Sequence, residues 1–96
     1  MNLASLLREK RTYLIDAARR HGAENVRVFG SAARGTETEG SDLDLLVDVG
    51  DRTSLLDLVK LQLELEDALG VSVDVVTADD LPANIRGQVV SSARPI

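Results

Sequence analysis

The chain contains no cysteine, so disulfide bonds, thiolate metal ligands and cysteine nucleophiles are all excluded. Aromatic side chains are limited to Tyr13 and Phe29. Without aromatic platforms on which bases stack, we do not expect an OB-like or RRM-like surface for single-stranded nucleic acid. The N-terminus has no apolar leader, and no stretch approaches the roughly 18 apolar residues of a membrane span. We therefore expect a cytoplasmic protein with no membrane partner.

Positive charge is also scarce, because the net charge of the 96 residues is −5. Duplex nucleic acid is repelled by such a surface unless a basic patch is set aside for it. Arg8, Lys10 and Arg11 form one small basic cluster and Arg19-Arg20 another, and we interpret both as solvated faces of a helix. We expect no direct nucleic-acid partner, whereas a ligand neutralised by metal ions is compatible with an acidic protein.

The length permits one domain, residues 1–96, with one modest core. Apolar residues make up 44% and charged residues 28%, which is the balance of a globular chain rather than a disordered one. No second lobe is available to shape a large acceptor. Any sizeable acceptor must therefore be shaped by another molecule.

Hydrophobic periodicity predicts three helices and three strands. The first helix ends at Gly22 and the second at Gly70, while the last has Asp80 as a possible cap and Pro82 in its first turn. A short link makes the first two strands antiparallel neighbours, and the helical link predicts a parallel right-handed crossover to the third. We expect an α+β fold: a mixed three-stranded sheet in the order 1-2-3 with helices packed on one face. The expected helices cover residues 3–21, 54–69 and 81–93, the strands 25–29, 42–49 and 71–77, and a tail 93–96.

Asp42 and Asp44 lie two positions apart on the second expected strand. Side chains on a strand alternate with period two, so both carboxylates project from the same face. Two like charges so close repel each other, and a hard divalent cation such as Mg²⁺ resolves the repulsion. The alternative is an exposed polar strand face that happens to carry two aspartates.

Gly30 and Ser31 follow the first expected strand and open about one helical turn, Ser31-Ala32-Ala33-Arg34. A strand-Gly-Ser-helix junction points free backbone N–H groups at one spot, which favours an anion. The Ser31 hydroxyl can add a hydrogen bond, and Arg34 can add positive charge. The alternative is an ordinary turn in which Ser31 caps the helix.

Asp74 stands in the middle of a strongly apolar strand, where an unpaired carboxylate is costly. If the third strand lies beside the second, Asp74 joins Asp42 and Asp44 on a common face; otherwise it is an edge-strand aspartate in solvent. An anion cradle and three carboxylates together make a two-metal phosphoryl-transfer site, in which positioning and charge neutralisation matter most. The lone His21 is interpreted as a C-terminal charge of the first helix rather than a catalytic group.

These residues resemble a known signature. Gly30-Ser31-x-x-Arg34-Gly35, a six-residue gap holding Ser41, and Asp42-x-Asp44-Leu45 are similar to the bipartite motif of the DNA polymerase β-like nucleotidyltransferases. The short chain and the segment Val73-Asp74-Val75-Val76 narrow the resemblance to the minimal nucleotidyltransferases. The resemblance covers roughly residues 10 to 90.

The resemblance implies a role for each motif residue. Asp42 and Asp44 would bind two Mg²⁺ ions, and Asp74 would bind the catalytic ion and help to deprotonate the acceptor hydroxyl. The triphosphate of ATP would be held by Gly30, Ser31, Arg34 and Ser41. AMP would be transferred and pyrophosphate released. Many minimal members resemble antitoxins that bind a HEPN-domain RNase toxin and add AMP to a toxin tyrosine.

Two other functions remain open at the level of the sequence. The protein could be a binding module that neutralises the toxin by covering it, with or without catalysis. It could also be a small-molecule nucleotidyltransferase resembling the aminoglycoside-modifying enzymes. These enzymes usually carry an added helical domain, which dimerisation or a partner chain would have to supply here.

Overall fold

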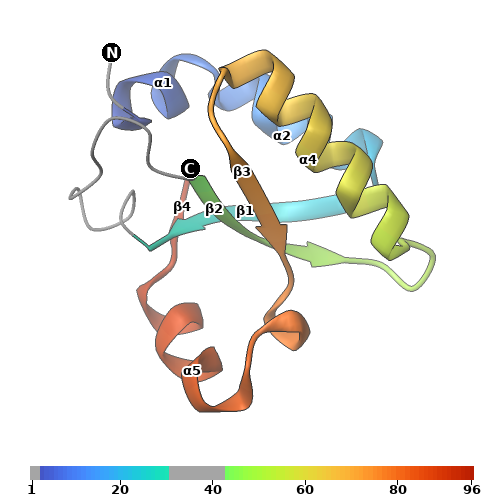
Figure 1. Cartoon of the computed structure of the whole chain (residues 1–96), viewed down its shortest axis with the longest axis vertical. Helices are drawn as coiled ribbons and strands as arrows, with labels where there is room; N and C mark the ends of the chain where they lie inside the picture. Colours follow the sequence, from blue (N-terminus) through green and yellow to red (C-terminus); the bar gives the residue numbers. More distant parts are fainter. Residues whose placement is uncertain (1–2, 31–42) are drawn as a thin grey trace.

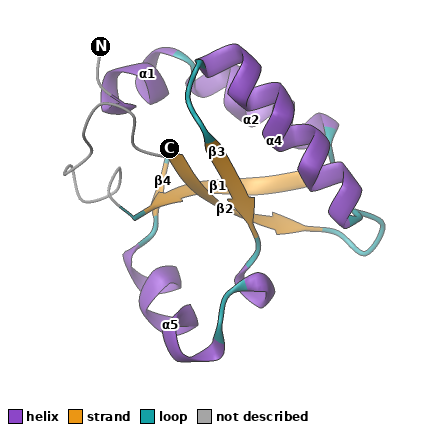
Figure 2. Cartoon of the chain, in the orientation of Figure 1, coloured by secondary structure: helices purple, strands orange, loops and turns teal. Residues whose placement is uncertain are grey.

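The structure is a computed structural model, and it describes residues 3–30 and 43–96 (Figure 1, Figure 2). Most of the described residues lie in helices or strands. In order they are α1 (Leu3–Glu9), α2 (Arg11–Arg20), β1 (Ala23–Phe29), β2 (Leu43–Val49), α4 (Leu55–Leu69), β3 (Val73–Val76), the 3-10 turn η1 (Ala78–Asp80), α5 (Ala83–Ser92) and β4 (Arg94–Pro95).

The strands form one mixed sheet in the order β3-β2-β1-β4. β1 and β2 are antiparallel, and β2 and β3 are parallel, so the expected α+β fold and the order 1-2-3 are confirmed. The expected tail 93–96 is wrong in part, because β4 pairs antiparallel with β1 at Arg27 and Val28. Two residues are too few to show a period-two pattern, so the sequence gives no strand signal there.

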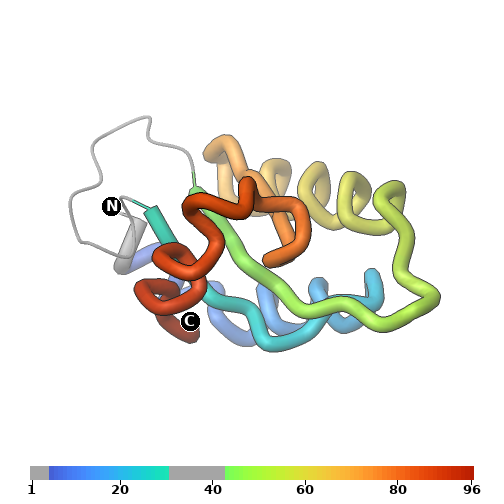
Figure 3. Tube along the Cα trace, turned by 90° about the horizontal axis from the view of Figure 1, so that it is seen from below, coloured from blue at the N-terminus to red at the C-terminus, as the bar shows by residue number. Residues whose placement is uncertain are grey.

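The core lies between one face of the sheet and the helices α2 and α4. Period-two alternation turns the odd-numbered side chains of β2 and β3 into this core, and every third or fourth residue of α4 meets them. Figure 1 shows α1, α2 and α4 together on one side of the strands, and Figure 3 shows α5 nearer the viewer than α2 and α4. The side chains that β2, β3 and α4 bury in this core are Leu43, Leu45, Val47, Val73, Val75, Leu58, Leu61, Leu65 and Leu69.

The first expected helix, 3–21, is two helices in the structure. The break falls at Lys10, whose φ of −100° and ψ of 10° lie outside the helical range. Backbone hydrogen bonds still cross it, from Lys10 N to Leu6 O (2.9 Å) and from Leu14 N to Lys10 O (2.9 Å). Neither Gly nor Pro marks this position, so the sequence gives no sign of the break.

α4 has the expected extent, and its ends are held by local chemistry. Ser54 and Asp57 form a capping box: Asp57 N donates to Ser54 Oγ (3.2 Å), and Ser54 N donates to Asp57 Oδ2 (2.8 Å). The resulting hydrogen bonds lower the pKa of Asp57. Gly70 ends the helix with φ of 72°, as expected.

Asp80 does not cap the last helix. Its carboxylate instead accepts a hydrogen bond from Thr77 N (3.2 Å) and closes η1, and α5 begins at Ala83 directly after Pro82. The expected start at residue 81 is therefore two residues early. Within the parts of the chain that the structure describes, no helix combines the length and apolar character needed to cross a membrane.

Candidate functional site

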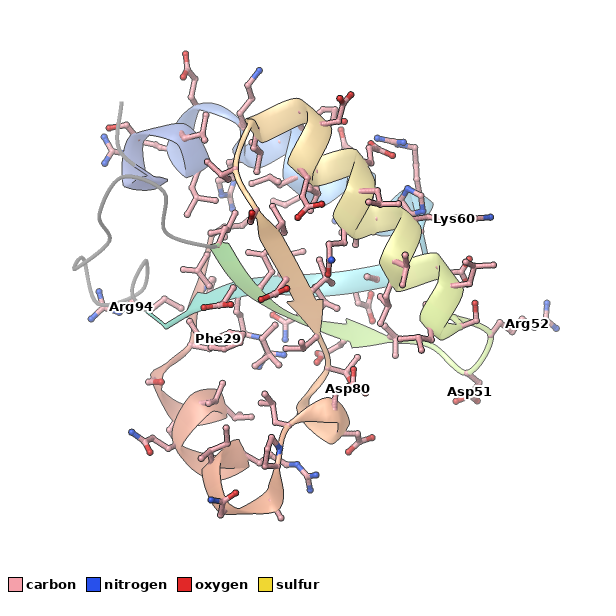
Figure 4. All side chains as sticks on the ribbon, in the orientation of Figure 1. Phe29, Asp51, Arg52, Lys60, Asp80 and Arg94 are labelled. Carbon is pink, nitrogen blue, oxygen red and sulfur yellow. The ribbon has the colours of Figure 1, made fainter. Side chains whose placement is uncertain are left out.

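Asp44 lies on the second strand of the sheet from the β3 edge, between two in-register neighbours. The β1 partner of Asp44 is Phe29, labelled in Figure 4, and the β3 partner is Asp74. Adjacent strands run roughly 4.8 Å apart, so Asp44 and Asp74 are side by side. Because Leu43 and Val73 are buried in the core, the two aspartates project from the opposite face of the sheet.

Gly30 brings the end of β1 against the Asp44 carboxylate. Its φ of +74° lies in the left-handed region that favours glycine. A Cβ atom at this position would lie 2.6 Å from Asp44 Oδ2. The sequence suggested that this glycine leaves room for a phosphate, which stays a prediction; the structure adds that the Asp44 carboxylate lies where a Cβ atom of residue 30 would crowd it. This second reason for a glycine cannot be read from the sequence.

The remaining candidate residues, Ser31, Arg34, Ser41 and Asp42, lie outside the described residues. In residues 3–30 and 43–96, no group of three or more His, Asp or Glu side chains is placed to hold a metal ion. The described part therefore contributes two of the three expected carboxylates. Carboxylate oxygens on neighbouring strands fit a hard divalent cation, which prefers oxygen ligands.

The two described carboxylates differ in their surroundings. Asp44 is half-buried, whereas Asp74 is exposed on β3, which is an edge strand. Asp74 forms no ion pair with another residue that the structure describes. Two negative groups on adjacent strands repel one another, so the pair favours a cation or a cationic ligand between them. The exposed position also lets Asp74 reach an incoming molecule.

Arg86 of α5 fixes the turn that follows the strand of Asp74. Its Nε donates to the carbonyl of Ala78 (2.8 Å), and its Nη2 donates to the carbonyl of Leu81 (3.0 Å). The turn held by Arg86 includes η1, which contacts β2. Leu46 of β2, on the same face as Asp44, is fully buried. An arginine in a polar helix is typical of an exposed surface position, so the sequence did not predict the hydrogen bonds from Arg86 to this turn.

His21 belongs to a separate cluster between α2 and α4. Its Nε2 lies 2.9 Å from Glu64 Oε1, and Glu64 also accepts hydrogen bonds from Arg20 Nη2 (2.7 Å) and Tyr13 Oη (2.8 Å). These hydrogen bonds, that of Arg20 foremost, lower the pKa of Glu64 from 4.5 to about 2. The hydrogen bond between Tyr13 and Glu64 also raises the pKa of Tyr13. The cluster ties two helices together on the core side of the sheet.

A cavity of about 330 Å³ lies where α2 approaches β1 and β4. It is lined by Arg11, Arg19 and Asn25 among others, and by none of Gly30, Asp44 and Asp74. The candidate site is therefore the part of the sheet face that carries the two aspartates and not this cavity.

Comparison with known proteins defines the class. Residues 11–96 match the nucleotidyltransferase domain family. A candidate protein adenylyltransferase of Methanocaldococcus jannaschii is 38% identical over 93 residues, which span 97% of this chain and 96% of that protein. The protein adenylyltransferase MntA of Thermococcus cleftensis is 41% identical over 71 residues, which span 74% of this chain and 72% of that protein.

Solved structures agree with this class. A candidate minimal nucleotidyltransferase superposes with a TM-score of 0.87 at 47% identity, over 100% of this chain and 97% of that one. A toxin–antitoxin crystal structure with AMP-PNP superposes with a TM-score of 0.74 at 26% identity, over 88% of this chain and 69% of that one. The fold and the sequence together define a nucleotidyltransferase. The chain belongs to the nucleotidyltransferase domain family and, within it, to the minimal nucleotidyltransferases, which confirms the resemblance.

Proposed function

We propose that this protein transfers AMP from ATP to a tyrosine hydroxyl of a HEPN-domain toxin and thereby acts as an antitoxin. The observation that carries the proposal is the pair Asp44 and Asp74, side by side on one face of the sheet with Gly30 against Asp44. The acceptor oxygen attacks the α-phosphorus, a new O–P bond forms, and the bond to the β-phosphate oxygen breaks. Pyrophosphate leaves, and the proton of the hydroxyl passes to a carboxylate.

Each candidate residue has a role in this proposal. Asp42, Asp44 and Asp74 would hold two Mg²⁺ ions, which supply charge neutralisation to the attacking and leaving oxygens. Asp74 suits the proton acceptor because it is exposed at the sheet edge, where the hydroxyl of another molecule can approach. The triphosphate would be held by Gly30, Ser31, Arg34 and Ser41.

A protein acceptor is favoured by the fold of the described residues and by the relatives of this chain. The described residues form one sheet with one main core, and none of their elements builds a second lobe around the aspartates. An acceptor at such a site must itself supply the rest of the binding surface, as a protein can. The MntA relative is named as a protein adenylyltransferase, and a structural neighbour is a toxin–antitoxin complex with AMP-PNP. These relatives support ATP as the donor and a toxin as the acceptor.

The test uses the purified protein, ATP, Mg²⁺ and a HEPN toxin from the same genome, with the intact mass of the toxin as readout. The wild type should add AMP-sized increments. Asp44→Asn and Asp74→Asn should each slow the addition roughly a hundredfold or more, as expected when charge stabilisation is lost. The matched control is Asp51→Asn, an exposed aspartate in the turn far from the site (Figure 4).

The outcomes separate this function from its alternatives. Wild-type rates in both variants would show that these aspartates are not the site. Toxin inhibition without any AMP increment would favour neutralisation by complex formation. Labelling of a small hydroxylated molecule in preference to the toxin would favour a small-molecule nucleotidyltransferase.

A further inference from the structure

β3, the strand that carries Asp74, is paired on one side only. It is four residues long and pairs with β2, and no other strand of the described residues lies beyond it. Short edge strands are among the parts of a sheet that open most easily. Asp74 also lies beside Asp44 across this pair, and two like charges repel one another. Until a cation neutralises the two carboxylates, the repulsion therefore pushes β3 away from β2.

Two side chains of α4 form hydrogen bonds with the outer edge of β3. Val73 N donates to Glu66 Oε2 (2.9 Å), and Val75 N donates to Gln62 Oε1 (3.2 Å). The two donors belong to the residues directly before and directly after Asp74. On an edge strand such groups are ordinarily left to water or to an added strand. We call Gln62 and Glu66 the edge clip.

The spacing of the edge clip matches the spacing of the strand. Gln62 and Glu66 are four residues apart on one side of α4, which is about 6.0 Å along a helix. Val73 and Val75 are two residues apart, which is about 6.6 Å along a strand. The chain turns back from the end of α4 into β3, so Glu66 meets the first valine and Gln62 the second (Figure 1). Both hydrogen bonds can therefore form at the same time.

The edge clip acts on Asp74 through the backbone. Val73 and Val75 are buried in the core, so packing and one hydrogen bond each hold the residues on both sides of Asp74. Because side chains alternate along a strand, fixing these neighbours directs the Asp74 side chain to the opposite face, toward Asp44. α4 packs on the core side of the sheet, so the clip residues do not approach what Asp74 binds.

We propose that Gln62 and Glu66 are positioning residues for AMP transfer, which hold Asp74 beside Asp44 against the repulsion of the two carboxylates. The inference rests on the proposed function, because it gives the two residues a part in the reaction at the same site. Asp74 serves the chemical step, whereas the triphosphate would be held at Gly30 and the residues after it. Loss of the edge clip should therefore lower kcat and leave KM for ATP near the wild-type value.

The experiment measures kcat and KM for ATP with the HEPN toxin as acceptor, at a temperature where circular dichroism shows every variant folded. Gln62→Ala and Glu66→Ala each remove one acceptor. Each should lower kcat roughly tenfold, because a displacement of about 1 Å costs about a hundredfold and β2 still holds the other side of β3.

Conservative variants separate positioning from a general loss of stability. Gln62→Glu and Glu66→Gln keep an acceptor oxygen at each position, so kcat should stay within roughly twofold of the wild type. The matched control is Asp67→Ala, which removes an exposed carboxylate from the next position of α4 and should leave kcat unchanged.

Amide hydrogen exchange tests the edge clip without reference to activity. The amide of Val73 should exchange at least roughly tenfold faster in Glu66→Ala, and the amide of Val75 in Gln62→Ala. Unchanged exchange of both amides would overturn the clip itself.

The kinetic outcomes separate this inference from the proposed function. Wild-type kcat in both alanine variants would overturn the positioning role, as would an equal loss in the alanine and conservative variants. A raised KM for ATP at unchanged kcat would place the effect on nucleotide binding and would also overturn it. A wild type that transfers no AMP would refute the proposed function and this role together, while the exchange rates would still show whether Gln62 and Glu66 hold β3.

Discussion

Gly30→Ala tests whether the position of the Asp44 carboxylate controls the activity. The added methyl group is small and apolar, and it changes no charge. In the structure it meets two obstacles, the positive φ of residue 30 and the Asp44 oxygen 2.6 Å from the new Cβ. Ordinary contacts of a Cβ atom begin at 3.4 Å, so the carboxylate must retreat.

The two obstacles have separate magnitudes. A non-glycine residue in the left-handed region costs roughly 1–2 kcal/mol of stability. This lowers the melting temperature of a domain of this size by roughly 4–8 °C per kcal/mol. The retreat of Asp44 amounts to about 0.8 Å, and a displacement on the order of 1 Å can reduce a rate about a hundredfold. Gly30→Ala should therefore lose far more AMP transfer than stability.

Gly70→Ala is the matched control. Its φ of +72° is nearly that of Gly30, but apart from its chain neighbours no atom of the described residues lies within 4 Å of the new Cβ. It should show the backbone cost alone, with a lower melting temperature and wild-type AMP transfer at a temperature where all variants are folded. Calorimetry and the toxin mass assay measure the two quantities. Equal activity of Gly30→Ala and Gly70→Ala would refute the reasoning.

Three further predictions concern stability, measured by urea unfolding. Glu64→Gln should lower the free energy of unfolding by about 1 kcal/mol at neutral pH, a value discounted for the partial exposure of the pair. The folded structure lowers the pKa of Glu64 from 4.5 to about 2, so the carboxylate contributes its full stability above pH 4.5. The difference in stability between variant and wild type should therefore close as the pH falls toward 2. An unchanged gap at low pH would contradict this cause. Leu61→Ala, at a buried position, should cost about 2–5 kcal/mol, whereas Leu63→Ala in dilute protein should cost under about 1 kcal/mol. Ser54→Ala removes the N-cap of α4 and should cost about 1 kcal/mol, with Ser54→Asp close to wild type.

The shared face of Asp44 and Asp74 could be predicted from the sequence on the condition that the third strand lies beside the second. Period-two alternation fixes which residues of a strand share a face, and a helical crossover makes the joined strands parallel. The register that sets the two carboxylates directly side by side comes from the structure and could not be read from the sequence. The roles of the candidate residues in catalysis stay predictions.

Other features depend on contacts between distant residues, and the sequence carried no sign of them. The crowding of Gly30 by Asp44 arises only once β1 and β2 are paired. The hydrogen bonds of Arg86 to η1 need α5 to fold back over the turn. Asp80 is a different case, because its carboxylate closes a local capping box with Thr77, three residues earlier, in place of the expected cap of the last helix.

The short strand β4 determines how α5 is held. β3 and β4 are the two edge strands of the sheet, so the segment between them, which contains α5, connects opposite edges of the sheet. None of the ten residues of α5 is buried, and its attachment rests on Arg86 at one end and on the β4 ladder at the other. Releasing either end would cost few contacts. We expect amide protons of α5 to exchange with solvent much sooner than those of α4, which is anchored along its whole length.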